Sequence, residues 1–260
     1  MIAMLHIQTA LRENKTYLKS CFCTTPFKVA NITEDKNDNI LKLMLMSSSP
    51  GILDGDDYHL KIELQEGSSL ELQTQSYQRL FDMKTGASQN IEVHAGNRSF
   101  FCYLPHPAVP HKASDFTAVN KIYLSENCRL IWGEVLTCGR KLNGELFKFS
   151  KYQNQTEVFL NQKLIVKENL LLRPSKINVS AIGQLEGYTH QASLIYIDTK
   201  ANINEIISKI TESIARQNNV CFGVSALPVN GLIVRLMGYR GEQLYNCLHM
   251  ISTLFEIEIS

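Results

Sequence analysis

The chain has 260 residues, and its 26 Lys and Arg residues nearly balance its 25 Asp and Glu residues, leaving a net charge of +1. A chain of this length buries roughly 70–75% of the surface that it exposes when unfolded, so a sizeable core needs no disulfide or metal. The balanced charge provides no electrostatic excess for binding nucleic acid or an anionic membrane. We therefore expect protein or small-ligand partners, and neither nucleic acid nor membrane.

The N-terminal residues and the cysteines bear on location. Residues 1–8 show no basic region followed by an apolar run, as a signal peptide would. The longest apolar stretches, such as 41–46 and 131–135, are far shorter than the ~20 residues that span a bilayer. Seven scattered cysteines indicate reduced thiols. Cys21 and Cys23 could contact one metal, but buried or half-buried thiols are the favoured interpretation. A cytoplasmic protein is expected.

Most of the first 199 residues are predicted to form strands. Apolar and polar residues alternate in segments such as 60–64 and 70–74, so their side chains take opposite faces of a strand. Dipeptides that tolerate positive φ separate such segments and favour tight turns: Glu66-Gly67, Gly96-Asn97 and Asn143-Gly144. The pattern predicts an antiparallel, hairpin-rich and β-dominated structure.

Residues 200–260 have apolar residues at helical spacing in two places. Asn202 and Glu205 resemble a capping box at the start of the first helix. Asn230-Gly231 is a hairpin signal between the two helices. The predicted elements are a helix, two strands and a helix: 203–217, 220–227, 232–237 and onward from Gly241.

These patterns predict a β-dominated α+β fold with two helices in the C-terminal third. Residues 1–199 are mostly β, and residues 200–260 form a helix–hairpin–helix portion of the same unit. No fixed-period repeat, charge block or low-complexity linker separates the two parts. A single domain over 1–260 is therefore predicted.

The sequence contains no strong catalytic signature: no Walker-type loop, Gly-x-Gly-x-x-Gly, His-Glu-x-x-His or Gly-x-Ser-x-Gly. His94, His106 and His111 are the best local metal candidates, because imidazole binds nickel, zinc and copper. Nearby prolines enforce an extended backbone in which His106 and His111 do not automatically converge, so surface histidines are favoured. We predict that the protein is not an enzyme; a metal-dependent hydrolase is the weakest alternative.

Residues 131–149 carry the most informative polar groups. Glu134 lies in an apolar run, where a carboxylate needs a partner or internal water because burying it alone is costly. Arg140 and Glu145 flank the Asn143-Gly144 turn. They form a cross-strand ion pair in one interpretation. In the other, they line a polar interior passage with Glu134.

The order of motifs along the chain resembles the UreD family of urease accessory proteins, called UreH in some systems. The motifs are SPGILDGD (49–56), LQTQS (72–76), LPHP (104–107) with VP (109–110), GE (133–134), GR (139–140), NGE (143–145), Phe147, GLIVR (231–235) and Gly238. The resemblance implies a partly solenoid-like β-sheet fold. It also implies a cytoplasmic protein that binds UreF, recruits the GTPase UreG through it, docks on the urease apoprotein and promotes nickel insertion.

An interior nickel passage, which the resemblance also implies, needs weak and replaceable ligands such as carboxylates, carbonyls and water. No tightly bound cofactor is expected, only transient nickel, and His106 and His111 are weak candidates for tight binding. The alternative is a pure assembly adaptor with no nickel passage. The candidate residues for the passage are Asp56, Gln75, Glu134, Arg140 and Glu145.

Overall fold

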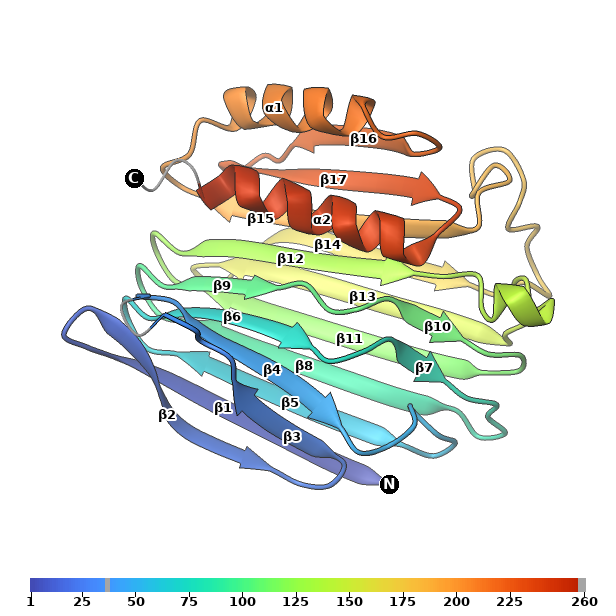
Figure 1. Ribbon diagram of the computed structural model, residues 1–260, viewed down its shortest axis with the longest axis horizontal. Helices are drawn as coiled ribbons and strands as arrows, with labels where there is room; N and C mark the ends of the chain where they lie inside the picture. Colours follow the sequence, from blue (N-terminus) through green and yellow to red (C-terminus); the bar gives the residue numbers. More distant parts are fainter. Residues whose placement is uncertain (36–37, 257–260) are drawn as a thin grey trace.

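Two β-sheets, A and B, lie face to face in the computed structural model, which describes residues 1–35 and 38–256 (Figure 1). Two helices, α1 (Ile203–Ala215) and α2 (Gly241–Glu256), cover part of the outer face of sheet B. Strands predominate over helices, and both helices lie in the C-terminal third. The predicted β-dominated α+β class is confirmed.

Sheet A has seven strands: β1 (Ile2–Arg12), β2 (Lys15–Cys23), β5 (Asp57–Leu64), β8 (Ala87–Ala95), β11 (Asp115–Leu124), β13 (Lys151–Leu160) and β14 (Lys163–Leu172). They lie in the order β14-β13-β11-β8-β5-β1-β2. The five strands from β13 to β1 in this order are parallel to one another, while β14 and β2 are antiparallel additions at the two edges.

Sheet B has ten strands: β3 (Phe27–Asn31), β4 (Leu41–Ser47), β6 (Ser69–Thr74), β7 (Gln78–Leu80), β9 (Phe100–Tyr103), β10 (Ala108–Pro110), β12 (Arg129–Leu136), β15 (His190–Asp198), β16 (Cys221–Ala226) and β17 (Gly231–Gly238). The main order is β16-β17-β15-β12-β9-β6-β4-β3, with β10 pairing with β12 and β7. Strands β4, β6, β9 and β12 are parallel, as in sheet A.

The chain alternates between the two sheets in its middle part, so successive strands stack as coils of a solenoid. The corners between sheet A and sheet B use residues with positive φ, namely Gly67, Arg98 and Asn127. Successive corners are hydrogen-bonded: Gly67 N donates to Asn97 O at 2.9 Å, and Arg98 N donates to Glu126 O at 3.1 Å. These bonds pair backbone N–H and C=O groups of the corners, which lie outside the strands and would otherwise lack a partner within a sheet.

The structure corrects the prediction of antiparallel pairing for the middle of the chain. The turns at 66–67 and 96–97 connect a strand of sheet A to a strand of sheet B, rather than two neighbours of one hairpin. A residue tolerant of positive φ suits both kinds of turn. True hairpins with antiparallel pairing occur at the edges, as between β13 and β14 and between β16 and β17.

The hairpin predicted at Asn143-Gly144 is also wrong. Residues Lys141–Asn143 form a single 3₁₀ turn, η1, which Gly144 ends with φ of 73° and a hydrogen bond from its N–H to Lys141 O. The strands on either side, β12 and β13, belong to different sheets. The Asn-Gly signal marks a local reversal, but does not determine which strands it joins.

The helix–hairpin–helix prediction for the C-terminal part is confirmed, with α1, β16, β17 and α2 in that order. At the start of α1, the Asn202 side chain accepts a hydrogen bond from Glu205 N, as the capping box requires. Neither helix of the described residues is both long and apolar enough to cross a membrane. The single domain over 1–260 stays a prediction, and residues 36–37 and 257–260 lie outside the described part.

Apolar side chains form two cores, one on each face of sheet B. The larger core fills the space between the sheets and includes Trp132, while the smaller core lies between sheet B and the helices and includes Ile206 and Leu248. Full burial of one such aliphatic side chain contributes roughly 1.5–3 kcal/mol.

Candidate functional site

Glu134 is the central polar group of the core between the sheets. Its position in β12 turns its side chain toward sheet A, and three groups donate hydrogen bonds to its Oε1: Trp132 Nε1 at 2.7 Å, Thr156 Oγ1 at 2.9 Å and Asn120 Nδ2 at 3.2 Å. Asn154 Nδ2 donates to Oε2. The carboxyl group of Glu134, which is half-buried, is thus satisfied by four donors, as an acid in an apolar core must be.

The donors from sheet A occupy inward positions of a strand pattern that is otherwise apolar. Asn120 of β11 and Asn154 and Thr156 of β13 are all buried. Asn120 Nδ2 also lies 2.8 Å from Asn154 Oδ1 and 2.9 Å from Thr156 Oγ1. Such a closed network fixes the side chains in one arrangement, because each unpaired polar group would be costly there.

Opposing influences act on the acidity of Glu134. Burial raises the pKa of Glu134, hydrogen bonds from Trp132 and Thr156 oppose the rise, and the negative charge of Glu168 adds to it. The net direction is upward. A raised pKa means that the negative charge of Glu134 is held at a cost, which a nearby cation would relieve.

Strand register places two polar rows opposite each other at one edge of the two-sheet stack. On sheet A, Asn120 pairs with Thr156, which pairs with Glu168 of β14. On sheet B, Glu134 of β12 pairs with Ser193 of β15, which pairs with Arg235 of β17. Sheet A ends at β14, while sheet B continues to β17 and β16, so the rows meet where the stack opens.

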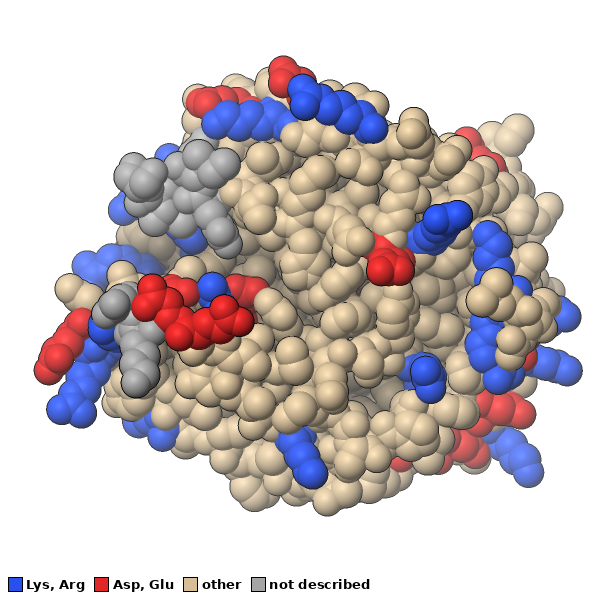
Figure 2. Space-filling model, viewed as in Figure 1, with Lys and Arg blue, Asp and Glu red and all other residues tan. Residues whose placement is uncertain are grey.

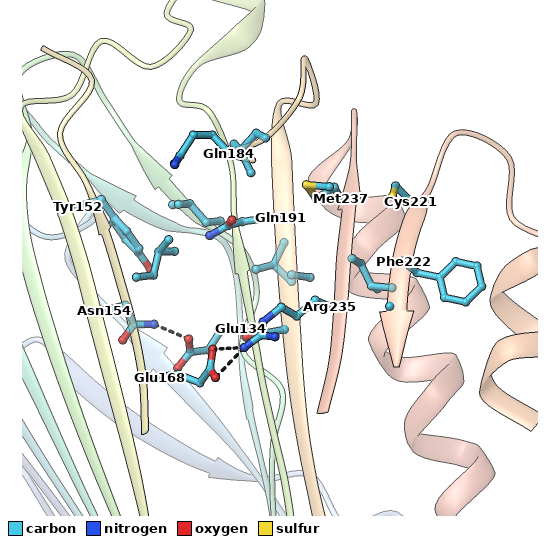
Figure 3. A pocket seen from close by; sticks show the side chains of 18 of the residues that line it. Glu134, Tyr152, Asn154, Glu168, Gln184, Gln191, Cys221, Phe222, Arg235 and Met237 are labelled. Atoms are coloured by element: carbon cyan, nitrogen blue, oxygen red, sulfur yellow. Dashed lines mark hydrogen bonds and ion pairs between the residues drawn. The ribbon is translucent and has the colours of Figure 1, made fainter. Parts of the chain in front are cut away.

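Three cavities lie in series between the sheets, and the second adjoins each of the other two. The first, of about 440 Å³, lies at the open edge and includes Glu134, Glu168 and Arg235 in its lining (Figure 3). The second, of about 70 Å³, shares four lining residues with the first: Glu134, Val135, Tyr152 and Asn154. The third, of about 100 Å³, shares four with the second: Thr74, Gln78, Gln89 and Tyr103. Glu134 therefore lies at the junction of the first two.

Two of the predicted passage residues, besides Glu134, lie at or near the third cavity. Gln75 belongs to its lining. Asp56 is buried at a corner before β5, where it accepts hydrogen bonds from Leu53 N at 2.8 Å, Tyr58 OH at 3.1 Å and the amino group of Met1 at 3.0 Å. Tyr58 lines the third cavity, whereas Asp56 lies behind it.

Arg140 and Glu145 lie on the loop after β12, and neither contributes to the lining of the three cavities. Arg140 Nε donates to Glu145 Oε2 at 2.8 Å, and Lys112 N donates to the same oxygen at 3.2 Å. The Arg140 guanidinium holds the pKa of Glu145 at about 2. The two residues do pair, but within one loop rather than across two hairpin strands.

The three histidines considered as metal ligands are kept apart by the fold. His94 stacks on Tyr123 at a ring distance of 4.8 Å, His106 stacks on Tyr245 of α2 at 4.6 Å, and His111 packs against Phe81. Among the described residues, no three His, Cys, Asp or Glu side chains gather as a metal-binding group. The hydrolase alternative therefore lacks its ligand set.

The cysteine pair that could contact one metal lies at an edge of sheet A. Cys21 and Cys23 are exposed residues of β2. Partial desolvation by its surroundings and the neighbouring Cys23 raise the pKa of the Cys21 thiol even though the residue is exposed, which disfavours the thiolate that a metal needs. The interpretation of Cys21 and Cys23 as buried or half-buried thiols is wrong.

Four further residues belong to the site, and the sequence patterns did not predict them there: Glu168, Arg235, Asn120 and Asn154. A signal existed for the two asparagines, since they occupy inward positions in alternating segments where an apolar residue is expected. Nothing in the sequence paired Glu168 with Arg235, because they are 67 residues apart and only the strand register brings them together.

The comparisons with known proteins agree along the whole chain. The family model described as UreD urease accessory protein matches residues 1–259. A protein of Flavobacterium johnsoniae named urease accessory protein UreD is 50% identical, over 96% of this chain and 91% of its own. Proteins of the same name from Acetivibrio thermocellus and Actinobacillus pleuropneumoniae (serotype 5b) are 32% and 34% identical, over 96% and 95% of this chain and 95% and 94% of theirs.

All three relatives carry the name of a urease accessory protein. The chain belongs to the UreD family of urease accessory proteins. The resemblance inferred from the motif order is confirmed.

Proposed function

We propose that the protein is a scaffold for urease maturation that binds UreF, recruits the GTPase UreG through it, and docks on the urease apoprotein. In this proposal nickel moves toward the urease active site through the three adjoining cavities. The observation that carries the proposal is the position of Glu134 at the junction of the first and second cavities, where four hydrogen bonds fix its carboxylate.

The lining of the cavities suits a cation in transit. It offers carboxylate, amide, hydroxyl and phenol oxygens, as from Glu134, Asn154 and Gln75. Oxygen ligands of this kind bind nickel more weakly than a set of imidazoles and thiolates, so the ion is released again. A tight cage would retain the ion instead of passing it on.

The outer surface supports the proposal of protein partners. Figure 2 shows a broad area with few Lys, Arg, Asp or Glu side chains over the face that carries α2, and most of the charged side chains lie toward the rim. Surfaces depleted of charge at their centre and charged at the rim are typical of protein interfaces. We place the protein in the cytoplasm, where its partners would act.

The passage is tested with Glu134→Gln, which removes the charge and keeps the size of the side chain. We expect a large loss of urease activation in cells and of nickel in the purified urease, with the accessory complex still assembled. Glu145→Gln is the matched control, because it removes a charge outside the cavities and should retain activation. Normal activation by Glu134→Gln would contradict the passage.

The adaptor alternative, in which nickel travels elsewhere, is separated by obstruction of the second cavity. Ala118 lines this cavity and is 5% exposed, so Ala118→Leu fills the space at an overpacking cost of about 1–3 kcal/mol. Ala3→Leu imposes a comparable cost in the same core away from the cavities. Activation lost only in Ala118→Leu supports a passage, whereas equal activation in both variants supports an adaptor.

A further inference from the structure

The ion pair between Arg235 and Glu168 bridges the two sheets at the open edge of the first cavity (Figure 3). Arg235 Nη2 lies 2.7 Å from Glu168 Oε1 and 2.8 Å from Oε2. Glu168 belongs to β14 of sheet A and Arg235 to β17 of sheet B. The pair thus connects strands that share no backbone hydrogen bond.

Arg235 is the only Lys or Arg among the described residues that line the first cavity, and Glu134 and Glu168 are its only acids. Glu134 and Glu168 line the same cavity, and the negative charge of Glu168 adds to the rise in the pKa of Glu134. When both acids are ionised, they outnumber the one guanidinium in the lining of this cavity. Arg235 therefore occupies the position next to the Glu168 carboxylate that an incoming cation would bind.

The pair is easily opened. Arg235 is 60% exposed and Glu168 is 33% exposed, so water solvates both when they separate. Exposed ion pairs stabilise a fold by only about 0–1 kcal/mol. Gly223 of β16 pairs with Arg235 in register, and a Cβ added at Gly223 would meet no atom within 4 Å. A displaced guanidinium therefore has room on that side.

We propose that Arg235 determines the cation selectivity of the cavity mouth: it is a built-in counter-ion on Glu168 that divalent cations displace and monovalent cations do not. This inference rests on the proposed nickel passage for the identity of its cargo. It assigns to Arg235 a specificity role, and to Glu168 the role of first carboxylate met by the entering ion.

Charge explains the selectivity. At equal distance from Glu168, a divalent ion gains twice the Coulomb energy of a guanidinium or a sodium ion. It also gains from Glu134 deeper in the cavity, whose charge no guanidinium neutralises. A sodium ion has the same charge as the Arg235 guanidinium but makes no hydrogen bonds to Glu168, so it does not displace Arg235. Potassium and sodium, the abundant cations in a cell, would otherwise fill the mouth.

A purely structural role is the rival explanation, in which Arg235 only ties β14 to β17. The two differ in one respect. A structural tie affects unfolding and leaves the competition between cations unchanged, whereas a counter-ion affects that competition and contributes little to unfolding.

The experiment measures Ni²⁺ binding to the full-length chain by titration calorimetry, with UreF coexpressed if the chain aggregates alone. Each protein is titrated in sodium chloride and in tetramethylammonium chloride of equal ionic strength, because the bulky ammonium cannot replace sodium at Glu168. Arg235→Gln removes the counter-ion and Arg235→Lys keeps its charge. Arg98→Gln removes an exposed Arg–Glu pair at a corner far from the cavity and is the matched control.

We expect the native protein to bind Ni²⁺ equally in the two salts. Arg235→Gln should bind Ni²⁺ about fivefold tighter in the ammonium salt, the equivalent of about 1 kcal/mol. It should lose much of this gain in sodium chloride, because sodium now competes. Arg235→Lys and Arg98→Gln should behave as the native protein does, and Glu168→Gln should bind Ni²⁺ several-fold more weakly in both salts.

The inference is overturned if Arg235→Gln matches the native protein in both salts, if the native protein is itself sodium-sensitive, or if no variant binds Ni²⁺ measurably. Its failure is distinct from failure of the passage, which is judged by urease activation in Glu134→Gln. If Glu134→Gln loses urease activation and Arg235→Gln shows unchanged cation selectivity, the passage is retained and the role of Arg235 is rejected. If Glu134→Gln activates urease normally and Arg235→Gln shows altered selectivity, the role of Arg235 is retained and the passage is rejected.

Discussion

Single residues hold their ionisation states through burial, and His190 is the clearest case outside the cavities. Its side chain is 6% exposed, and burial together with the charge of Lys141 lowers the pKa of His190 to about 4. Its Nδ1 lies 2.8 Å from Thr189 Oγ1. The folded state thus favours the neutral imidazole, in contrast to an unfolded chain with its ordinary pKa of 6.5.

This shift predicts a loss of stability in acid. Because the folded pKa lies below the unfolded one, the contribution of His190 is complete above about pH 6.5 and is lost as the pH falls toward about 4. Urea unfolding of His190→Gln at a series of pH values should show a smaller decrease over this window than the native chain. Lys141→Met should show an intermediate decrease, because one cause of the shift is removed. An identical decrease in all three proteins would contradict the assignment.

At the scale of elements, the cap of α1 offers a test that separates local from tertiary contributions. Asn202→Ala removes the side-chain acceptor for Glu205 N and should lower the free energy of unfolding by about 0.5–2 kcal/mol. Asn204 lies two residues after Asn202, at an exposed position inside the helix. Asn204→Ala replaces a weak helix former with a strong one and should not lower the free energy of unfolding. Denaturant midpoints of the two variants provide the comparison, and equal losses would refute a capping role.

The elements themselves were largely predictable from sequence, but their neighbours were not. Alternation and helical spacing predicted β5, β6, β16, β17 and both helices, since these patterns depend on residues close in sequence. The pairing of β5 with β8 depends on stacked corners at Gly67, Arg98 and Asn127, which recur at intervals of about 30 residues. The side chains at these corners differ in chemistry, so the backbone conformation repeats while the amino-acid sequence does not.

The same limit applies to the site. Glu134 was predictable because a carboxyl group in an apolar strand must find partners, wherever they come from. Its partners were not, because Thr156 and Asn120 reach it from the opposite sheet. Arg140 and Glu145 were grouped with Glu134 by closeness in sequence, and the change of sheet after β12 takes them out to a surface loop.

At the scale of the whole molecule, the two faces of the sheet stack differ in their polarity. The outer face of sheet A has charged side chains in register across neighbouring strands, as at Lys61, Glu92 and Lys121. The face that carries α2 has a broad area with few charged residues (Figure 2). Tyr77, 38% exposed, and Met44, which is half-buried, are among the apolar side chains of sheet B and its connections.

Apolar side chains on this weakly charged face, such as Tyr77 and Met44, predict that the chain associates with itself when its partner is missing, because exposed apolar surface favours association. Expressed without UreF, the chain should aggregate, and coexpression should keep it in solution.

The double variant Met44→Lys and Tyr77→Lys should increase the soluble fraction of the chain alone, since it places two charges on the face that carries α2. Thr117→Lys with Gln155→Lys adds the same charge to sheet A and should not. A native chain that elutes alone as a monodisperse monomer in size-exclusion chromatography would contradict the prediction, and equal gains from both double variants would show that net charge, rather than this face, governs solubility.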